Sequence, residues 1–270
     1  ARSEHALSYD KERGLVLLVG GYINGGPSSS VVWGYDGSSW RQMGELHPEG
    51  EEPFSYIWKP GLTYDTRRKV TVFHGGYGLS ETASHATWEY DGTSWREVTP
   101  TDPEGDGNPV SRENHALTYD STRGVTILFG GLVGGTIFTD SWKYDTWEYD
   151  GVSWREVTPT DPEDDPEDDG NPSARSGHAM VYDSSRGRVV LFGGIYYDNG
   201  FNYFNDTWEW DGLSWRQVAP TDPEGDGNPS ARSGHAMVYD SSRGVTVLFG
   251  GSHDNNRFND TWEWDGSSWR

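Results

Sequence analysis

The sequence predicts an all-β fold in which five repeated units, each of four antiparallel strands, form a radial array. Three observations support this prediction. Near-copies of one segment recur about 55 to 60 residues apart. Each copy alternates short apolar runs with turn residues, and tryptophan is abundant. A four-stranded unit cannot bury both of its faces alone, so such units stack on one another.

The repeat is clearest where residues 178–194 (HAMVYDSSRGRVVLFGG) return almost unchanged at 235–251. Weaker copies occupy 5–21, 60–76 and 115–131. A second signature follows each copy, at 32–41, 87–96, 146–155, 207–216 and 261–270, the last reading TWEWDGSSWR. We therefore expect one domain over 1–270, with units at about 1–46, 54–99, 110–158, 173–219 and 230–270.

Within one unit, the first strand ends at a Tyr-Asp pair such as Tyr182 and Asp183, and a polar Ser-Ser-Arg-Gly turn follows. The continuous apolar run RVVLF predicts a second strand buried on both faces. It ends at a Gly-Gly pair, where the backbone passes close to a neighbour or takes a positive φ. TWEW predicts the third strand, Asp-Gly the hairpin turn, and SSWRQV the fourth strand.

The composition places this core in its aromatic residues. Hydrophobic residues make up 33% of the 270 residues, but aromatic residues make up 14%. One buried aromatic side chain removes about 150–250 Å² from water. Tryptophan can therefore supply the burial that leucine usually supplies.

Charge and cysteine content exclude several functions. The net charge of −22 repels nucleic acid and anionic membranes, so a charged partner is expected to be cationic. The absence of cysteine excludes disulfides and thiolate chemistry. No apolar run approaches the roughly 20 residues of a membrane span. No signal peptide is visible, which fits a cytosolic protein or a trimmed mature one. Of these we favour an extracellular bacterial protein, and we expect a monomer.

The repeat resembles the kelch repeat: Gly-Gly after an apolar strand, Tyr-Asp or Trp-Asp near the end of a later strand, and a tryptophan several residues further on. The resemblance covers nearly the whole chain and implies a five-bladed β-propeller with one blade per repeat. A WD-repeat propeller is the alternative, because WDG occurs. In that family, however, the Gly-His and Trp-Asp pairs occupy different places in the blade.

Losses within the repeat suggest how the ring closes. A glutamate in the third strand is missing from blade 1, which has Gly34, and an arginine before the first strand is missing from blade 2, which has Ile57. A buried charge without its partner costs roughly 3–5 kcal/mol, so partners tend to be lost together. We therefore predict structural ion pairs between consecutive blades, with the last pair closing the ring: Glu89–Arg112, Glu148–Arg175, Glu209–Arg232 and Glu263–Arg2.

Long, varied loops after Gly-Gly predict a recognition face, because rigid scaffolds display functional loops. These loops combine aromatic rings with amides and carboxylates, which suits a sugar ring, a cation or a peptide segment. The expected ligand contacts are Tyr22, Trp58, Tyr77, Tyr196, Tyr197, Tyr203, His253 and Asp254, together with Glu4 and Glu113 near the axis.

The linkers between blades are acidic, as in TDPEGDGNP at 101–109 and 221–229. Alternating oxygens resemble a calcium loop, although the proline and the lack of a final glutamate argue against one. A solvated turn is favoured over weak calcium binding. The candidate calcium ligands are Asp102, Glu104, Asp106, Asp168, Asp169, Asp222, Glu224 and Asp226.

The repeated histidines His5, His115, His178 and His235 are expected to be structural rather than metal ligands. Kelch-like oxidases and specifier proteins imply cysteine chemistry that this chain lacks, and Glu4 and Glu113 form no obvious acid/base pair. We therefore expect a non-catalytic module that binds a protein segment, a carbohydrate or a cation. The alternatives are a mutarotase- or lyase-like enzyme that acts on a sugar in the central pocket, and an assembly scaffold.

Overall fold

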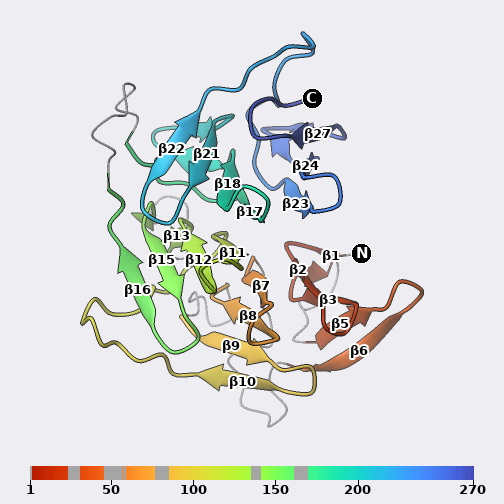
Figure 1. The fold of residues 1–270 in the computed structure, drawn as a ribbon, viewed down its shortest axis with the longest axis vertical. Coiled ribbons are helices and arrows are strands. Elements are labelled where there is room, and N and C mark those ends of the chain that lie inside the picture. The colour runs from red at the N-terminus through yellow and green to blue at the C-terminus, as the bar shows by residue number, and fades with distance from the viewer. Residues whose placement is uncertain are drawn as a thin grey trace.

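The computed structural model describes residues 2–23, 31–45, 57, 59–76, 85–134, 141–160 and 170–270. The chain forms a five-bladed β-propeller, in which five small antiparallel sheets are arranged around a central axis (Figure 1). The predicted fold class is therefore confirmed. Among the described residues we find no apolar helix of membrane-spanning length.

Blades 1 to 4 are meanders in which four strands pair in chain order, and blade 5 pairs three strands in the same way. Blades 1 and 2 contain β2 (Ala6–Asp10), β3 (Leu15–Val19), β5 (Val31–Tyr35) and β6 (Trp40–Glu45), then β7 (Gly61–Asp65), β8 (Val70–His74), β9 (Thr87–Tyr90) and β10 (Trp95–Val98). Blades 3 and 4 contain β11 (Ala116–Asp120), β12 (Val125–Phe129), β15 (Thr146–Tyr149) and β16 (Trp154–Val157), then β17 (Ala179–Asp183), β18 (Arg188–Phe192), β21 (Thr207–Trp210) and β22 (Trp215–Val218).

Blade 5 contains β23 (Ala236–Asp240), β24 (Val245–Phe249) and β27 (Thr261–Trp264). Its outer edge is completed by Arg270, whose backbone exchanges two hydrogen bonds with Glu263. Short two-stranded ladders extend the blades beyond the Gly-Gly pairs: β1 (Arg2–Ser3) with β4 (Tyr22–Ile23), β13 (Leu132–Val133) with β14 (Ser141–Trp142), β19 (Ile195–Tyr197) with β20 (Phe201–Tyr203), and β25 (Ser252–His253) with β26 (Asn256–Arg257).

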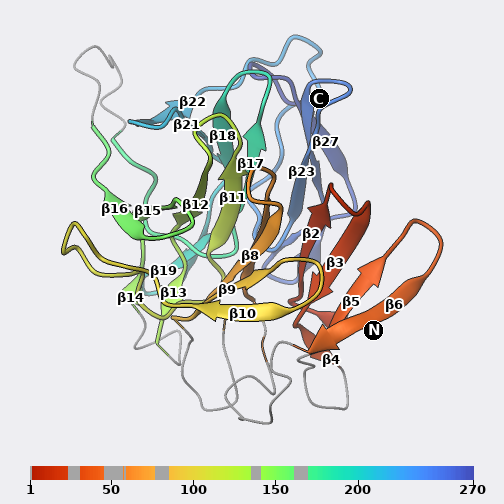
Figure 2. The same ribbon diagram turned by 60° about the horizontal axis from the view of Figure 1, so that its bottom comes forward.

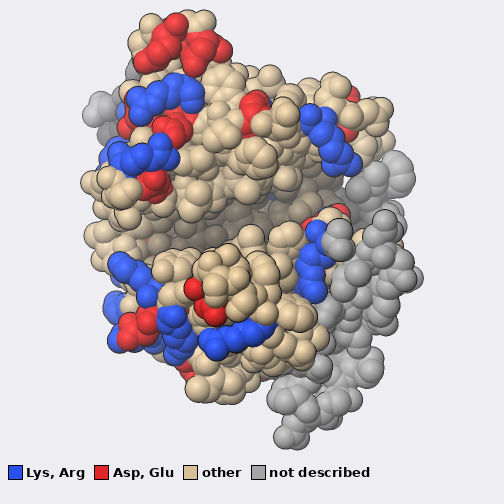
Figure 3. All heavy atoms as spheres, turned by 90° about the vertical axis from the view of Figure 1, so that its right-hand side faces the viewer, with Lys and Arg blue, Asp and Glu red and all other residues tan. Residues whose placement is uncertain are grey.

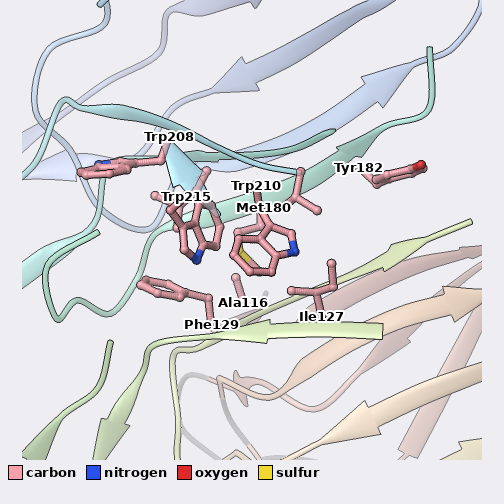
Figure 4. Close-up of a cluster of buried hydrophobic side chains, with 10 residues drawn as sticks. Ala116, Ile127, Phe129, Met180, Tyr182, Trp208, Trp210 and Trp215 are labelled. Carbon is pink, nitrogen blue, oxygen red and sulfur yellow. The ribbon is translucent and has the colours of Figure 1, made fainter. Parts of the chain in front are cut away.

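The apolar core lies between blades. Four buried clusters join blade 1 to 2, 2 to 3, 3 to 4 and 4 to 5. At the third junction, Trp215 of blade 4 packs on Phe129 of blade 3 with ring centroids 5.2 Å apart (Figure 4). Its Nε1 donates to Thr146 Oγ1 at 3.0 Å. Tryptophan therefore carries the core, as the composition predicted.

A repeated set of backbone contacts also joins neighbouring blades. In blades 1 to 4, the second glycine of the Gly-Gly pair donates its N–H to a carbonyl of the next blade, as Gly131 does to Arg175 at 2.9 Å. Near the axis, one residue per blade takes a left-handed φ. In blades 2 to 5 this residue donates its N–H to the equivalent carbonyl of the preceding blade: Lys59 to Glu4, Asn114 to Lys59, Gly177 to Asn114 and Gly234 to Gly177.

These contacts stop at the seam, which we define as the facing surfaces of blades 5 and 1. Within the described ranges, the Gly251 N–H and the Gly234 carbonyl find no counterpart in blade 1. The inner strands of consecutive blades contact one another from β2 to β23, but β23 and β2 do not contact each other in the same way. Blades 5 and 1 therefore lie on either side of an opening (Figure 1).

The predicted pairs between blades are wrong, because both charges find partners within their own blade. Each third-strand glutamate contacts the arginine of its own first turn, as Glu89 does Arg68 and Glu148 does Arg123. Glu209 and Glu263 contact Arg186 and Arg243 in the same way. In blade 1, the position of the missing glutamate is filled differently: a Cβ added to Gly34 would lie 2.8 Å from Met43 Cγ.

The predicted ring closure is also wrong. Arg2 donates to the Gly20 carbonyl of its own blade at 2.9 Å. Glu263 contacts Arg243 and, at 3.9 Å, Arg270. No ion pair between Glu263 and Arg2 is therefore available to close the ring.

Candidate ligand-binding face

A buried clamp positions the loops after Gly-Gly in blades 3 to 5. The arginine before the first strand forms a bidentate pair with the aspartate that precedes the third strand: Arg112 with Asp145, Arg175 with Asp206 and Arg232 with Asp260, all at 2.6–2.8 Å. The same guanidinium donates to the carbonyl of the first glycine of Gly-Gly. Each clamp therefore ties both ends of its loop to the blade.

The clamp also affects charge and packing. The hydrogen bonds from Arg232 lower the pKa of Asp260 to about 2 despite partial burial. The guanidiniums of Arg175 and Arg232 lie 4.1 Å from the ring centres of Phe204 and Phe258. In blades 4 and 5 the clamp is thus an ion pair capped by an aromatic plane, which fixes the two ends of the loop.

Aromatic rings join the hairpins of neighbouring blades on this face. Trp142 of blade 3 contacts Tyr196 of blade 4 edge-on, with centroids 5.4 Å apart. Tyr203 of blade 4 stacks on His253 of blade 5 at 4.2 Å. The hairpins of blades 3 and 4 gather at one end of the propeller, seen at the lower end of the blades in Figure 2. Blades 3 to 5 therefore present a continuous aromatic rim, which we call the hairpin rim.

The structure brings together three predicted contacts, Tyr196, Tyr203 and His253, but their rings largely contact one another and other hairpin rings. Tyr197 packs on Phe201 within its own hairpin, and Asp254 lies beside His253 with its side chain exposed. The exposed Tyr22 lies apart from this rim, on β4 of blade 1. Trp58 and Tyr77 lie outside the described residues.

The two carboxylates expected near the axis have different surroundings. Glu4 is exposed, and its backbone belongs to the left-handed residues that link the blades. Glu113 is buried, and its Oε1 lies 3.6 Å from Lys59 Nζ. Glu4 and Glu113 lie at repeat positions that differ by one residue, so they are not equivalent and do not form an acid/base pair.

The repeated histidines pack between blades. His178 meets Phe129 of the preceding blade edge-on at 5.5 Å, and His235 meets Phe192 in the same way. Burial, together with the nearby Arg112, lowers the pKa of His115 to about 3. Burial and Arg232 lower the pKa of His235 to the same value. These imidazoles are uncharged and pack between the blades, in line with the structural role expected for them.

The described linker carboxylates largely bind backbone. Asp102 accepts from the N–H groups of Gly105 and Gly107 at 2.8 and 3.2 Å, and Asp222 repeats both bonds with Gly225 and Gly227. Asp106 accepts from the N–H of Glu156 at 2.8 Å. Within the described ranges, no three His, Asp or Glu side chains converge on a metal position. Asp168 and Asp169 lie outside those ranges, while Glu104, Glu224 and Asp226 are exposed.

The central channel holds a cavity of about 390 Å³, which lies between the inner strands of all five blades and extends to their first turns. Its lining is mainly leucine, methionine, valine, threonine, serine and tyrosine. In the described part of the chain, Lys11 is the one charged residue that lines it, and no histidine or carboxylate does so.

Sequence reasoning missed the aspartates of the clamp and the most exposed rings of the hairpins, Tyr144 and Phe201. The signal for the clamp was available: Asp145, Asp206 and Asp260 directly precede the Thr-Trp-Glu triplets of the three blades in which it forms. Blades 1 and 2 have Val31 and Ala86 at this position.

The repeat and the blade arrangement define a five-bladed β-propeller. Residues 152–270 match the kelch-repeat domain family of KLHDC2, KLHL20 and DRC7. The chain is 25% identical over 218 residues to Mei4-dependent protein 6 of Schizosaccharomyces pombe, covering 74% of this chain and 29% of that protein. The solved structure of YjhT superposes on the whole chain with a TM-score of 0.69 at 11% identity, and the match covers 83% of YjhT. The chain is thus a β-propeller whose residues 152–270 are similar to kelch-repeat domains, and it spans less than a third of this curated relative.

Proposed function

We propose that this propeller is a non-catalytic module that binds a basic protein segment on the hairpin rim. The observation that carries the proposal is the contrast between the rim and the channel. The rim presents aromatic rings beside carboxylates, whereas the described lining of the channel offers no carboxylate or imidazole for acid/base catalysis.

The rim supplies both parts of such a surface. Phe201 and Tyr144 are 48% and 67% exposed although each belongs to or borders a hairpin that the clamp holds in place. Asp254 and Asp198 add exposed carboxylates nearby. Exposed rings on a fixed backbone bind with little loss of conformational freedom, and the carboxylates favour a cationic segment.

Kelch propellers generally act as protein-interaction modules, which also supports a peptide ligand over a sugar. The alternative of a sugar-modifying enzyme needs converging acid/base groups in the central pocket. Because His115, His178 and His235 are buried between blades, they are unavailable to a substrate in the channel.

An immobilised peptide array with basic, acidic and neutral members tests the proposal, and a glycan array serves as the second arm. We expect basic peptides to bind, and Phe201→Ser to weaken that binding about tenfold, because exposed aromatic anchors often contribute more than 1 kcal/mol. Leu213→Ser is the matched control, because Leu213 is 71% exposed on the outer turn of the same blade. Binding confined to glycans, or equal losses in both variants, would refute the proposal.

A further inference from the structure

Each closed junction has two complementary faces. At the junctions from blade 2 to blade 5, the trailing face of the earlier blade offers the residue before Gly-Gly, the threonine of the third strand and the Gly-Gly backbone. The leading face of the later blade offers a histidine, the fourth-strand tryptophan and a backbone carbonyl. The junction of blades 1 and 2 has Val32 and Pro60 in place of the threonine and the histidine. Between blades 4 and 5, for example, His235 and Trp269 pack on Phe192, and Trp269 Nε1 donates to Thr207 Oγ1 at 3.0 Å.

Blade 5 carries the same trailing face, but nothing in the described chain fills it. Phe249 is 55% exposed, whereas the equivalent Phe192 is fully buried. Thr261 is exposed, whereas Thr207 is buried. A Cβ added to Gly193 would lie 2.7 Å from the Arg232 carbonyl of the next blade, whereas the nearest neighbour at Gly250 is 3.5 Å away and belongs to blade 5 itself.

Blade 1 carries the matching leading face, and this face is also unfilled. Trp40 is 47% exposed, although its equivalents Trp154 and Trp269 are fully buried. Leu7 and Tyr9 on the inner strand are each about half exposed. At closed junctions, a turn arginine of the earlier blade reaches the Asp-Gly turn of the later one, as Arg186 reaches Gly266, but no atom lies within 4 Å of the corresponding Cβ position at Gly37.

The two unfilled faces bound a groove. Figure 3 views the molecule from this side and shows a hollow between blade 5 above and blade 1 below, lined mostly by residues that carry no charge. Apolar surface of this kind rarely stays open to water unless a partner covers it.

We propose that the seam binds one further kelch-type blade, supplied from outside residues 1–270. Continuity with the established junctions carries the proposal: a single blade with a histidine and a tryptophan on one face, and an aromatic residue and a threonine on the other, completes both faces at once. A second copy of the five-bladed chain could offer its blade 1 to blade 5, but would leave the other side of the groove unfilled. The occupant is therefore a single blade.

The sequence allows a direct test, because Arg270 is equivalent to Arg216. A second copy of residues 217–270 joined after Arg270 continues the repeat in register and adds a linker and a sixth blade. We expect this extension to raise the Tm by about 5 °C or more, because it covers the apolar groups of both faces. A folded, extended chain with an unchanged Tm, or an added blade that stays sensitive to protease, would overturn the proposal.

Phe249→Asp provides the internal control. In the 270-residue chain it should change the Tm by less than about 1 °C, because Phe249 is half exposed, whereas in the extended chain it should remove most of the gain. Phe192→Asp should destabilise both chains strongly. If Phe249→Asp destabilises the 270-residue chain as much as Phe192→Asp, the ring closes without a sixth blade. If light scattering shows a dimer that Phe249→Asp dissociates, a second copy is the occupant. Either result would overturn the proposal.

Discussion

The junction between blades 4 and 5 buries Phe192 and Trp269 completely, whereas the seam leaves their equivalents Phe249 and Trp40 about half exposed. The residue types are the same on both sides of the comparison. What differs is whether a neighbouring blade is present to receive them. Blade stability in this molecule therefore depends on the interfaces between blades more than on each sheet alone, as expected of repeated units that cannot bury their faces separately.

The largest difference in stability between a closed junction and the seam is expected when a tryptophan is replaced. Trp215→Ala removes a buried ring packed on Phe129 and leaves Thr146 without its donor, so unfolding should become easier by about 3–5 kcal/mol. Trp40→Ala at the seam should cost less than about 1 kcal/mol, because the ring is already half exposed. Urea denaturation measures both variants. Equal losses would show that the seam is packed like the junctions.

The sequence predicted those structural features that lie within a single repeat. The run TWEW gave a third strand at Thr207–Trp210, and the Gly-Gly pairs lie where two blades approach closely. These features depend on local chemistry and on periodicity. The prediction of β-strands, blade number and an aromatic core was correct for this reason.

The sequence did not predict which copies of a repeated residue meet. Glutamate and arginine recur with the same period, so a partner within the blade and a partner in the next blade give the same pattern. Arg68 and Arg123 at the turns were the true partners of Glu89 and Glu148, but their position is arginine even in blade 1, which lacks the glutamate. The joint loss of a glutamate and an arginine from the repeat therefore gave no information about these turn arginines. Closure is likewise a property of blade-to-blade angles, which no single repeat encodes.

The next difference between the closed junctions and the seam concerns the pH dependence of the free energy of unfolding. His115 and His235 are buried, and burial with a nearby arginine lowers the pKa of each to about 3. In the unfolded chain their pKa is about 6.5. As the pH falls below 6.5, the unfolded state takes up protons that the folded state excludes, so the stability present at neutral pH decreases. At pH 5 each such histidine should cost about 2 kcal/mol.

His235→Phe should therefore reduce the loss of stability between pH 7 and pH 5 relative to the unsubstituted chain. His5 is the matched control at the seam: it is only partly buried, and its pKa is lowered by burial and by Arg2. His5→Phe should change the pH dependence less than His235→Phe does. Chemical denaturation at pH 7 and pH 5 measures the free energy of unfolding of all three proteins. If this free energy changes equally with pH in all three, His235 is not an uncharged residue packed between the blades.

The smallest effect is expected at the junction of blades 1 and 2, which lacks one hydrogen bond present at the others. Val32 replaces the threonine that accepts from tryptophan elsewhere, and Nε1 of the buried Trp95 has no hydrogen-bond partner among the described residues. Both residues belong to the same buried cluster. Val32→Thr supplies an acceptor at nearly the same volume, so it should raise the free energy of unfolding by about 1 kcal/mol.

Thr207→Val is the reciprocal variant, since it removes the acceptor of Trp269 at a junction where the bond is formed. It should destabilise the chain by about 1–2 kcal/mol, because the indole N–H stays buried without a partner. Together the two variants measure what one bond adds to a junction that is otherwise packed. If Val32→Thr destabilises the chain, the desolvation of the hydroxyl outweighs the new bond, and blade 1 differs from the others in more than its missing acceptor.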